Sequence, residues 1–134
     1  TLCDTLSASN LPPTLHHGDF HSGNILCDQT CVVLDWSGFV GVSHPFLFLS
    51  VVSEEHSDPA VLSILLDAYL SAWTAYAPLP TLREYAQAGI ILGWLAGAIG
   101  HSRQLAIADG PWDKKQEQGN LEYCLSMLLS LLSA

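Results

Sequence analysis

Three polar side chains have the types and the spacing that metal-assisted transfer of a phosphoryl group requires. Asn24 stands five positions after Asp19, with four residues between them, and Asp35 follows after two short apolar segments. Such chemistry needs a carboxylate that orients an acceptor hydroxyl and takes its proton. It also needs an oxygen ligand for Mg²⁺ nearby and a second carboxylate that reaches the same metal from a separate element. Asp19, Asn24 and Asp35 suit these three roles in that order.

The residues around this set predict a loop followed by a hairpin. Gly18 and Gly23 bracket residues 16–24 and permit tight backbone turns there. The apolar, partly β-branched segments of residues 25–35 flank a polar turn at residues 28–30, which is typical of a β-hairpin. The hairpin would then deliver Asp35 back toward the loop.

The remainder of the chain, residues 45–134, is predicted to be helical. Pro45 favours the first turn of a short helix that runs to about Val52, and Asp58-Pro59 is typical of an N-cap followed by Pro at the first helical position. We expect Pro78 and Pro80 to end that second helix. The sequence therefore predicts an α+β fold, mainly α, with one small β-hairpin.

Two further helices are predicted beyond Pro80. The spacing of Thr81 to Glu84 matches a capping box, so a long helix should begin there and end at Gly110-Pro111. Asn120 is a candidate cap for a final leucine-rich helix. Residues 86–100 are nearly uncharged but fall short of the roughly 20 apolar residues of a membrane span, which favours a buried helix.

The charge of the chain disfavours two classes of partner. The formal net charge is -9, with only four Lys and Arg residues among 134. Nucleic acids and anionic membrane surfaces are bound through clustered basic side chains. We therefore expect neither nucleic acid nor a membrane as a partner. We also expect no secretory leader, because no charged segment precedes an apolar stretch.

The cysteines are interpreted as reduced thiols of a cytoplasmic protein. They are Cys3, Cys27, Cys31 and Cys124. Cys27 and Cys31 could face each other across the hairpin, so a disulfide stays open as an alternative, but we favour small apolar strand residues.

The segment from His17 to Asp35 resembles the catalytic segment of aminoglycoside phosphotransferases and choline kinase-like enzymes. The resemblance extends into residues 41–49 and covers about a quarter of the chain. It implies the helical C-terminal lobe of a protein kinase-like fold. It also implies transfer of the γ-phosphate of ATP or GTP to a hydroxyl of a small molecule, with Mg²⁺ as the cofactor. The acceptor, the choice between ATP and GTP, and the oligomeric state stay open.

The resemblance implies a role for each matching residue. Asp19 would be the catalytic Asp, and Asn24 and Asp35 would hold Mg²⁺. His17, Gly18, His21 and Gly23 would support the loop. Resembling enzymes attract cationic substrates with acidic residues in this lobe; Glu54, Glu55 and Asp58 are candidates here, although a solvated surface turn is the simpler interpretation.

The chain departs from the family pattern at three positions. Gly38 stands where an acidic residue is common, and His44 where many members carry Asp before Pro45. Phe48 stands where members commonly carry an Asp, whose carboxylate would pin the catalytic loop through backbone hydrogen bonds. Phe48 cannot accept such bonds.

The domain prediction is a single partial domain, 1–134, without the β-rich nucleotide lobe that should precede His17. On this reading the chain is a C-terminal fragment that is inactive alone, and its parent carries the missing N-terminal lobe. The alternative is a non-catalytic kinase-like remnant that binds a ligand or a partner. A zinc-stabilised module is disfavoured, although its candidate ligands would be His16, His17, His21, Cys27 and Cys31. His17 and His21 stand four positions apart, and Gly18 and Gly23 argue against the helix that this spacing would need.

Overall fold

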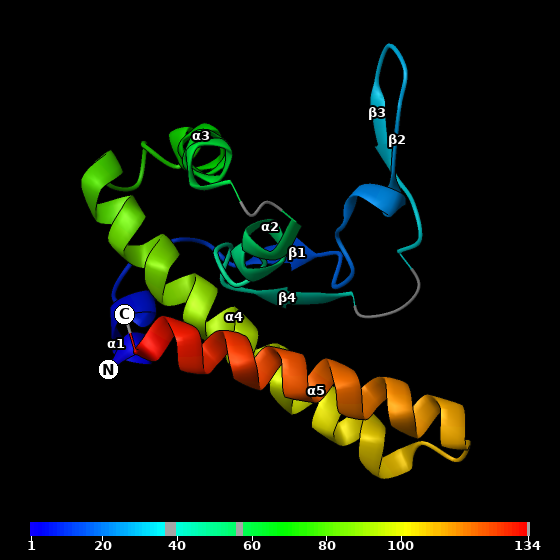
Figure 1. The fold of residues 1–134 in the computed structure, drawn as a ribbon. Helices are drawn as coiled ribbons and strands as arrows, with labels where there is room; N and C mark the ends of the chain where they lie inside the picture. Colours follow the sequence, from blue (N-terminus) through cyan, green and yellow to red (C-terminus); the bar gives the residue numbers. More distant parts are fainter. Residues whose placement is uncertain (37–39, 56–57, 134) are drawn as a thin grey trace. The chain divides into compact units, whose positions relative to one another are not determined.

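The computed structural model describes residues 1–36, 40–55 and 58–133, with only the backbone of Glu55. Gly38 therefore lies outside the described residues. The elements are α1 (Leu2–Ser7), β1 (Thr14–His16), η1 (Ser22–Asn24), β2 (Ile25–Cys27), β3 (Cys31–Val33), β4 (Gly41–Ser43), α2 (Leu49–Glu55), α3 (Pro59–Ser71), α4 (Leu79–Ile107) and α5 (Pro111–Leu132) (Figure 1). This is an α+β fold, mainly helical, as the sequence predicts. None of the described helices is long and apolar enough to cross a membrane.

The chain forms two compact units, residues 1–90 and 91–134, and α4 contributes to both. The first unit contains two separate two-stranded antiparallel sheets. In one sheet β2 pairs with β3, so the predicted hairpin at residues 25–35 is confirmed. The other pairs β1 with β4, with Leu15 opposite Val42. This second pair was not predicted, because three-residue strands separated by 24 residues show no local pattern that identifies them as partners.

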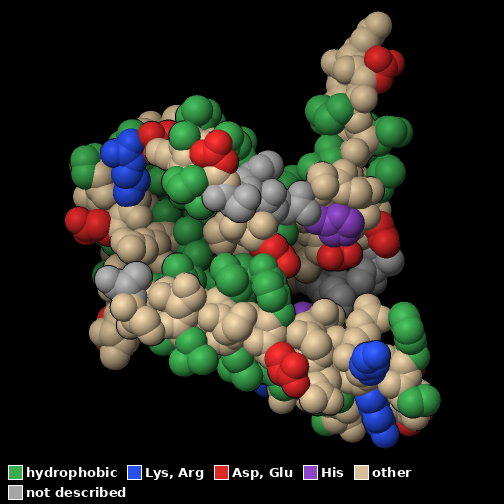
Figure 2. All heavy atoms as spheres, viewed as in Figure 1, with side chains coloured by type: hydrophobic (Ala, Val, Ile, Leu, Met, Phe, Trp, Pro, Cys, Tyr) green, Lys and Arg blue, Asp and Glu red, His purple; other side chains and the backbone are tan. Residues whose placement is uncertain are grey.

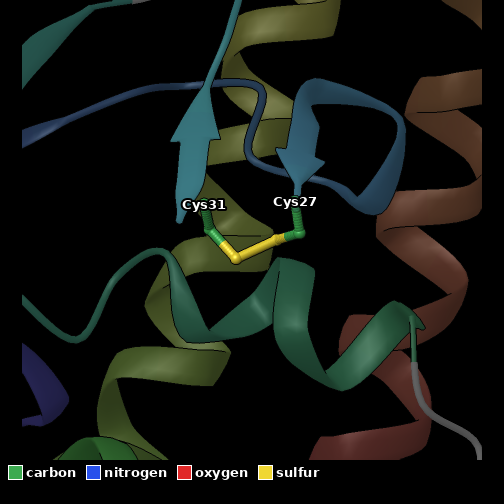
Figure 3. The surroundings of a disulfide bond; sticks show 2 residues. All are labelled: Cys27 and Cys31. Atoms are coloured by element: carbon green, nitrogen blue, oxygen red, sulfur yellow. A yellow bond between two sulfur atoms is a disulfide. The ribbon is translucent and has the colours of Figure 1, made fainter. Parts of the chain in front are cut away.

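Cys27 and Cys31 form a disulfide, which corrects the prediction of free thiols at these positions (Figure 3). They are directly paired across the hairpin, with their Cα atoms 4.1 Å apart. That register brings the two side chains to the same side of the sheet, within reach of a covalent bond. Cys3 and Cys124 do not form disulfides. The prediction of a cytoplasmic location rested partly on reduced cysteines at this hairpin. The disulfide removes that support, because disulfides are rare in the cytosol.

Several predicted helix ends are also corrected. The first short helix begins at Leu49 rather than at Pro45, and α3 ends at Ser71, well before Pro78. The N-cap at Asp58 is confirmed, because its Oδ1 accepts a hydrogen bond of 2.9 Å from the amide of Ala60.

The last two helices begin earlier than the polar residues suggested. Helix α4 begins at Leu79, which places Thr81 inside it, so the predicted capping box is wrong. Helix α5 begins at Pro111, with Gly110 as its N-cap, and runs through Asn120, so Asn120 is not a cap. In both cases a proline occupies the first turn, where its missing N–H costs nothing.

The core of the first unit is a cluster of large side chains around Phe46. Its buried members are Leu11, Phe46, Leu49, Leu70, Leu82 and Ala86. Helix α4 approaches this cluster closely at Gly89, where an added Cβ would lie only 2.6 Å from the carbonyl oxygen of Phe46. The segment between β4 and α2 is thereby packed against the backbone of α4.

The second unit consists of residues 91–107 of α4 and helix α5. Trp94, Ala98, Cys124 and Leu128 are its buried residues. The rings of Trp94 and Tyr123 meet edge-on at 5.6 Å. His101 Nδ1 and Glu117 Oε2 lie 2.8 Å apart and link the two helices near their connection.

Gly89→Ala should destabilise the protein, although Ala favours a helix over Gly by about 1 kcal/mol. The new Cβ would clash with the backbone at Phe46, and overpacking of this kind costs about 1–3 kcal/mol. Gly100→Ala is the matched control in the same helix, since an added Cβ meets nothing within 4 Å there. Chemical denaturation should show a loss for Gly89→Ala and no loss for Gly100→Ala; equal stability of the two variants would refute the close approach.

Candidate active site

The loop after β1 is held by its own backbone and by one histidine ring. Gly18 has a φ of 81°, a conformation that glycine adopts without steric cost. The amide of Gly23 donates to His21 Nδ1 at 3.1 Å, and the amide of Asn24 donates to the carbonyl oxygen of His21 at 2.9 Å. Together these bonds form the short turn η1 and turn the chain into β2.

Asp19 and Asn24 are in direct contact. The Asn24 carboxamide nitrogen donates to the carbonyl oxygen of Asp19 at 2.9 Å and to Asp19 Oδ2 at 3.3 Å. His21 Nε2 lies 3.7 Å from the same carboxylate oxygen. The Asp19 side chain remains more than half exposed. The structure therefore brings the predicted catalytic carboxylate and one predicted metal ligand together at the surface.

Asp35 is brought toward this pair through the backbone of Leu34. The Leu34 amide donates to the carbonyl oxygen of Asn24 at 2.8 Å. The Leu34 carbonyl oxygen accepts from His17 Nε2 at 2.6 Å. Asp35 follows immediately with a φ of 56°, a conformation that is uncommon for a residue other than glycine. Backbone outliers of this kind cluster at functional sites and motivate a functional hypothesis for Asp35.

His17 lies beneath the loop. The residue is buried, and its ring meets Trp36 edge-on at 4.7 Å and Phe20 at 6.3 Å. Because a carbonyl can only accept, the bond to Leu34 requires a proton on Nε2. His17 thus contacts the residues on either side of Asp35. These contacts suit a supporting role, which stays a prediction.

The acidic residues Glu54, Glu55 and Asp58 do not gather into one cluster among the described side chains. Asp58 caps α3, while Glu54 is exposed near the end of α2. The side chain of Glu55 lies outside the described residues. The cap explains Asp58 structurally, and a substrate-side role for the three stays a prediction.

A polar network next to the loop was missed by the sequence analysis. His44 Nδ1 accepts from the amide of Phe46 at 3.2 Å, and its Nε2 lies 3.0 Å from the Ser9 hydroxyl. His16 Nε2 donates to the carbonyl oxygen of His44 at 3.0 Å. Partial burial lowers the pKa of both His16 and His44, and the charge of His16 lowers that of His44 further. The alternation of Val40 and Val42 was the only sequence pattern that could have indicated β4 and this pairing.

The loop and the hairpin that carry Asp19, Asn24 and Asp35 lie within the part of the chain that matches a known protein family. The model of the phosphotransferase enzyme family matches residues 2–79, which is more than half of the chain. The chain belongs to the phosphotransferase enzyme family. Comparisons with curated proteins and with solved structures give no significant match.

The histidine network should make stability depend on pH. Because the folded-state pKa of His44 and of His16 lies below the usual value of 6.5, the unfolded chain binds more protons near and below that value. Their contribution to stability is therefore present above about pH 6.5 and is lost as the pH falls through the folded-state pKa values.

The matched variant is His44→Asn, whose side-chain oxygen can still accept from the amide of Phe46 but does not titrate. Unfolding free energies between about pH 7.5 and about pH 5 should fall less steeply for His44→Asn than for the wild type. Parallel pH profiles would show that His44 does not contribute.

Proposed function

We propose that this chain acts in the transfer of the γ-phosphate of ATP or GTP to a hydroxyl of a small molecule. The observation that carries the proposal is the contact of Asn24 with Asp19, together with the backbone bond that ties Asn24 to the residue before Asp35. Family membership supports phosphotransferase chemistry in general. The donor and the acceptor class are our inference from the residues at the site.

Asp19 is assigned to the acceptor hydroxyl. Both described contacts of its carboxylate involve Oδ2, which Asn24 and His21 flank, so we assign Oδ1 to the incoming hydroxyl. Asp19 accepts the hydroxyl proton as the acceptor oxygen bonds to the γ-phosphorus. The bond between that phosphorus and the β–γ bridging oxygen breaks, and the nucleoside diphosphate leaves.

Asn24 and Asp35 are assigned to Mg²⁺. A carboxamide oxygen and a carboxylate are the oxygen ligands that this ion takes, alongside water and substrate phosphates. The Asn24 nitrogen faces Asp19, so its carboxamide oxygen is the atom that would bind metal. Bound Mg²⁺ supplies charge neutralisation at the phosphate oxygens. Among the described residues no group of three or more His, Cys, Asp or Glu could hold a metal ion; the assigned set is smaller and includes Asn.

The nucleotide should be bound by residues beyond this site as well. A β-rich lobe with a phosphate-binding Lys would complete the phosphate clamp, and we propose that the natural protein supplies it. The competing proposal is a non-catalytic module that binds a ligand or a partner without turnover. It is the outcome to be accepted if the natural protein shows no metal-dependent nucleotide binding.

Asp35→Asn should weaken Mg-nucleotide binding more than Asp19→Asn does in the natural protein. Loss of residues that merely orient metal ligands already costs about 10–100-fold in metal affinity, so loss of a direct ligand should cost at least about 10-fold. Asp19→Asn should leave affinity nearly unchanged and lower turnover by about 10²–10⁴-fold. Asn tolerates the left-handed conformation at position 35, so the backbone is preserved.

The matched control is Asp28→Asn in the turn of the same hairpin, which removes the same charge far from the assigned ligands along the strands. Calorimetric titration of Mg-nucleotide and turnover assays should be run on all three variants. If Asp35→Asn binds as tightly as Asp28→Asn, Asp35 is not a metal ligand.

The 134-residue chain alone should not transfer phosphate at an enzymatic rate. Phosphoryl transfer depends almost wholly on positioning and charge neutralisation, and Asp19, Asn24 and Asp35 supply only the acceptor and metal side of both. A radiolabelled phosphate-transfer assay checks this. Steady turnover that disappears in Asp19→Asn would show that the chain carries a complete site.

A further inference from the structure

The ring of Phe48 contacts aromatic side chains from three separate parts of the first unit. It meets Tyr69 of α3 at a centroid distance of 4.9 Å, His16 of β1 at 6.0 Å and Phe20 of the loop at 6.1 Å. All three contacts are edge-to-face, the favoured geometry for aromatic pairs. Phe48 therefore lies where the loop, the first strand and the helical core meet.

The core side of this arrangement is firmly fixed. Phe48 stands between Phe46 and Leu49, which are both fully buried. The Tyr69 hydroxyl donates to the carbonyl oxygen of Pro45 at 2.9 Å. Burial raises the pKa of Tyr69 to about 12, so the hydroxyl stays protonated and keeps this bond. Phe48 thus rests on a ring that is held both by packing and by a hydrogen bond.

The loop side has weaker polar support. The Asp19 carboxylate accepts a hydrogen bond from Asn24, and this bond is exposed. His21 Nε2 lies 3.7 Å from the same carboxylate. Water competes for such exposed bonds, so they add little to the free energy of ordering the loop. Phe20, the next residue, instead places its ring between Phe48 at 6.1 Å and His17 at 6.3 Å. The ring contacts of Phe20 therefore join the residue after Asp19 to the core, in addition to the buried His17.

We propose that Phe48 is a positioning residue: its ring holds Phe20 and thereby orders the loop that presents Asp19. The role assigned to Asp19 rests on the proposed function, whereas the ordering of the loop does not. Figure 2 shows histidine and acidic side chains close together at the base of the hairpin, whose strands expose Leu26 and Val32.

The test is amide hydrogen exchange measured by NMR on the natural protein and on Phe48→Leu. The reporters are the amides of Gly23, Asn24 and Leu34, whose bonds define the loop and its tie to the hairpin. In Phe48→Leu these amides should exchange at least ~10-fold faster, while amides of α3 and of residues 82–90 in α4 change by less than ~3-fold. Phe48→Tyr keeps the ring and should restore slow exchange in the loop.

Leu66→Ala is the matched control for a loss of core packing. Leu66 packs against the same buried cluster, but it is not among the rings that surround Phe20. Leu66→Ala should accelerate amide exchange by a similar factor at all reporter amides of the first unit, in the loop and in the helices alike. If Phe48→Leu shows that uniform pattern, or no acceleration in the loop, the positioning role is refuted.

A second variant keeps the test decisive if Phe48→Leu fails to fold. Phe20→Leu removes the same ring contact from the loop side and should open the same three amides. Where both single variants fold, the double variant should add little to either, because both substitutions act through one contact. Fully additive effects would overturn the proposal.

Turnover and nucleotide binding separate this inference from the proposed function. If the wild type transfers phosphate, Phe48→Leu should lower kcat with little change in Mg-nucleotide affinity, and Phe48→Tyr should recover it. Selective loop opening in a protein that binds no Mg-nucleotide would refute the proposed function and leave the ordering role intact. An active enzyme whose loop amides ignore Phe48→Leu would refute the ordering role alone.

Discussion

The site depends first on the two backbone bonds of Leu34. The amide binds the carbonyl of Asn24, and the carbonyl binds the ring of His17. A single residue therefore joins the end of the hairpin to the loop on one side and to the buried histidine on the other. Because backbone groups form these bonds, the position of Asp35 depends on register more than on the side chain at position 34. The Leu34 side chain is exposed, which agrees with the backbone rather than the side chain making the contacts at this position.

The register of the hairpin is fixed at both of its ends. Two three-residue strands are too short to be stable alone in water. The Cys27–Cys31 disulfide closes the end near the turn, and the bond from Leu34 to Asn24 closes the other end (Figure 3). A shift by one residue would turn the side chain at position 35 to the opposite face. The covalent link therefore bears on the geometry of the site, although it lies at the far end of the strands.

Local sequence patterns were sufficient to predict those parts of the site whose residues are close together in the chain. The spacing of Asp19 and Asn24, the bracketing glycines and the hairpin at residues 25–35 all depend on neighbours within a few residues. The β1–β4 pair and the His16–His44 network depend on tertiary contacts between distant segments, which no local pattern encodes. The helix starts at Leu79 and Pro111 were missed for a related reason. Proline in a first turn and burial of an apolar face outweighed the capping preferences of Thr81 and Asn120.

The segment between β4 and α2 links the polar and apolar halves of the first unit. His44 accepts from the amide of Phe46, which fixes the turn, and Phe46 is buried against Gly89 of α4. Two residues later Phe48 leaves this fixed turn and reaches the loop at Phe20. A carboxylate in place of this ring would need several backbone donors from the loop to offset its desolvation. The donors at Gly23 and Asn24 are already used by His21. An aromatic ring needs no donors, so in this chain packing can order a loop in which the amides of Gly23 and Asn24 are already occupied.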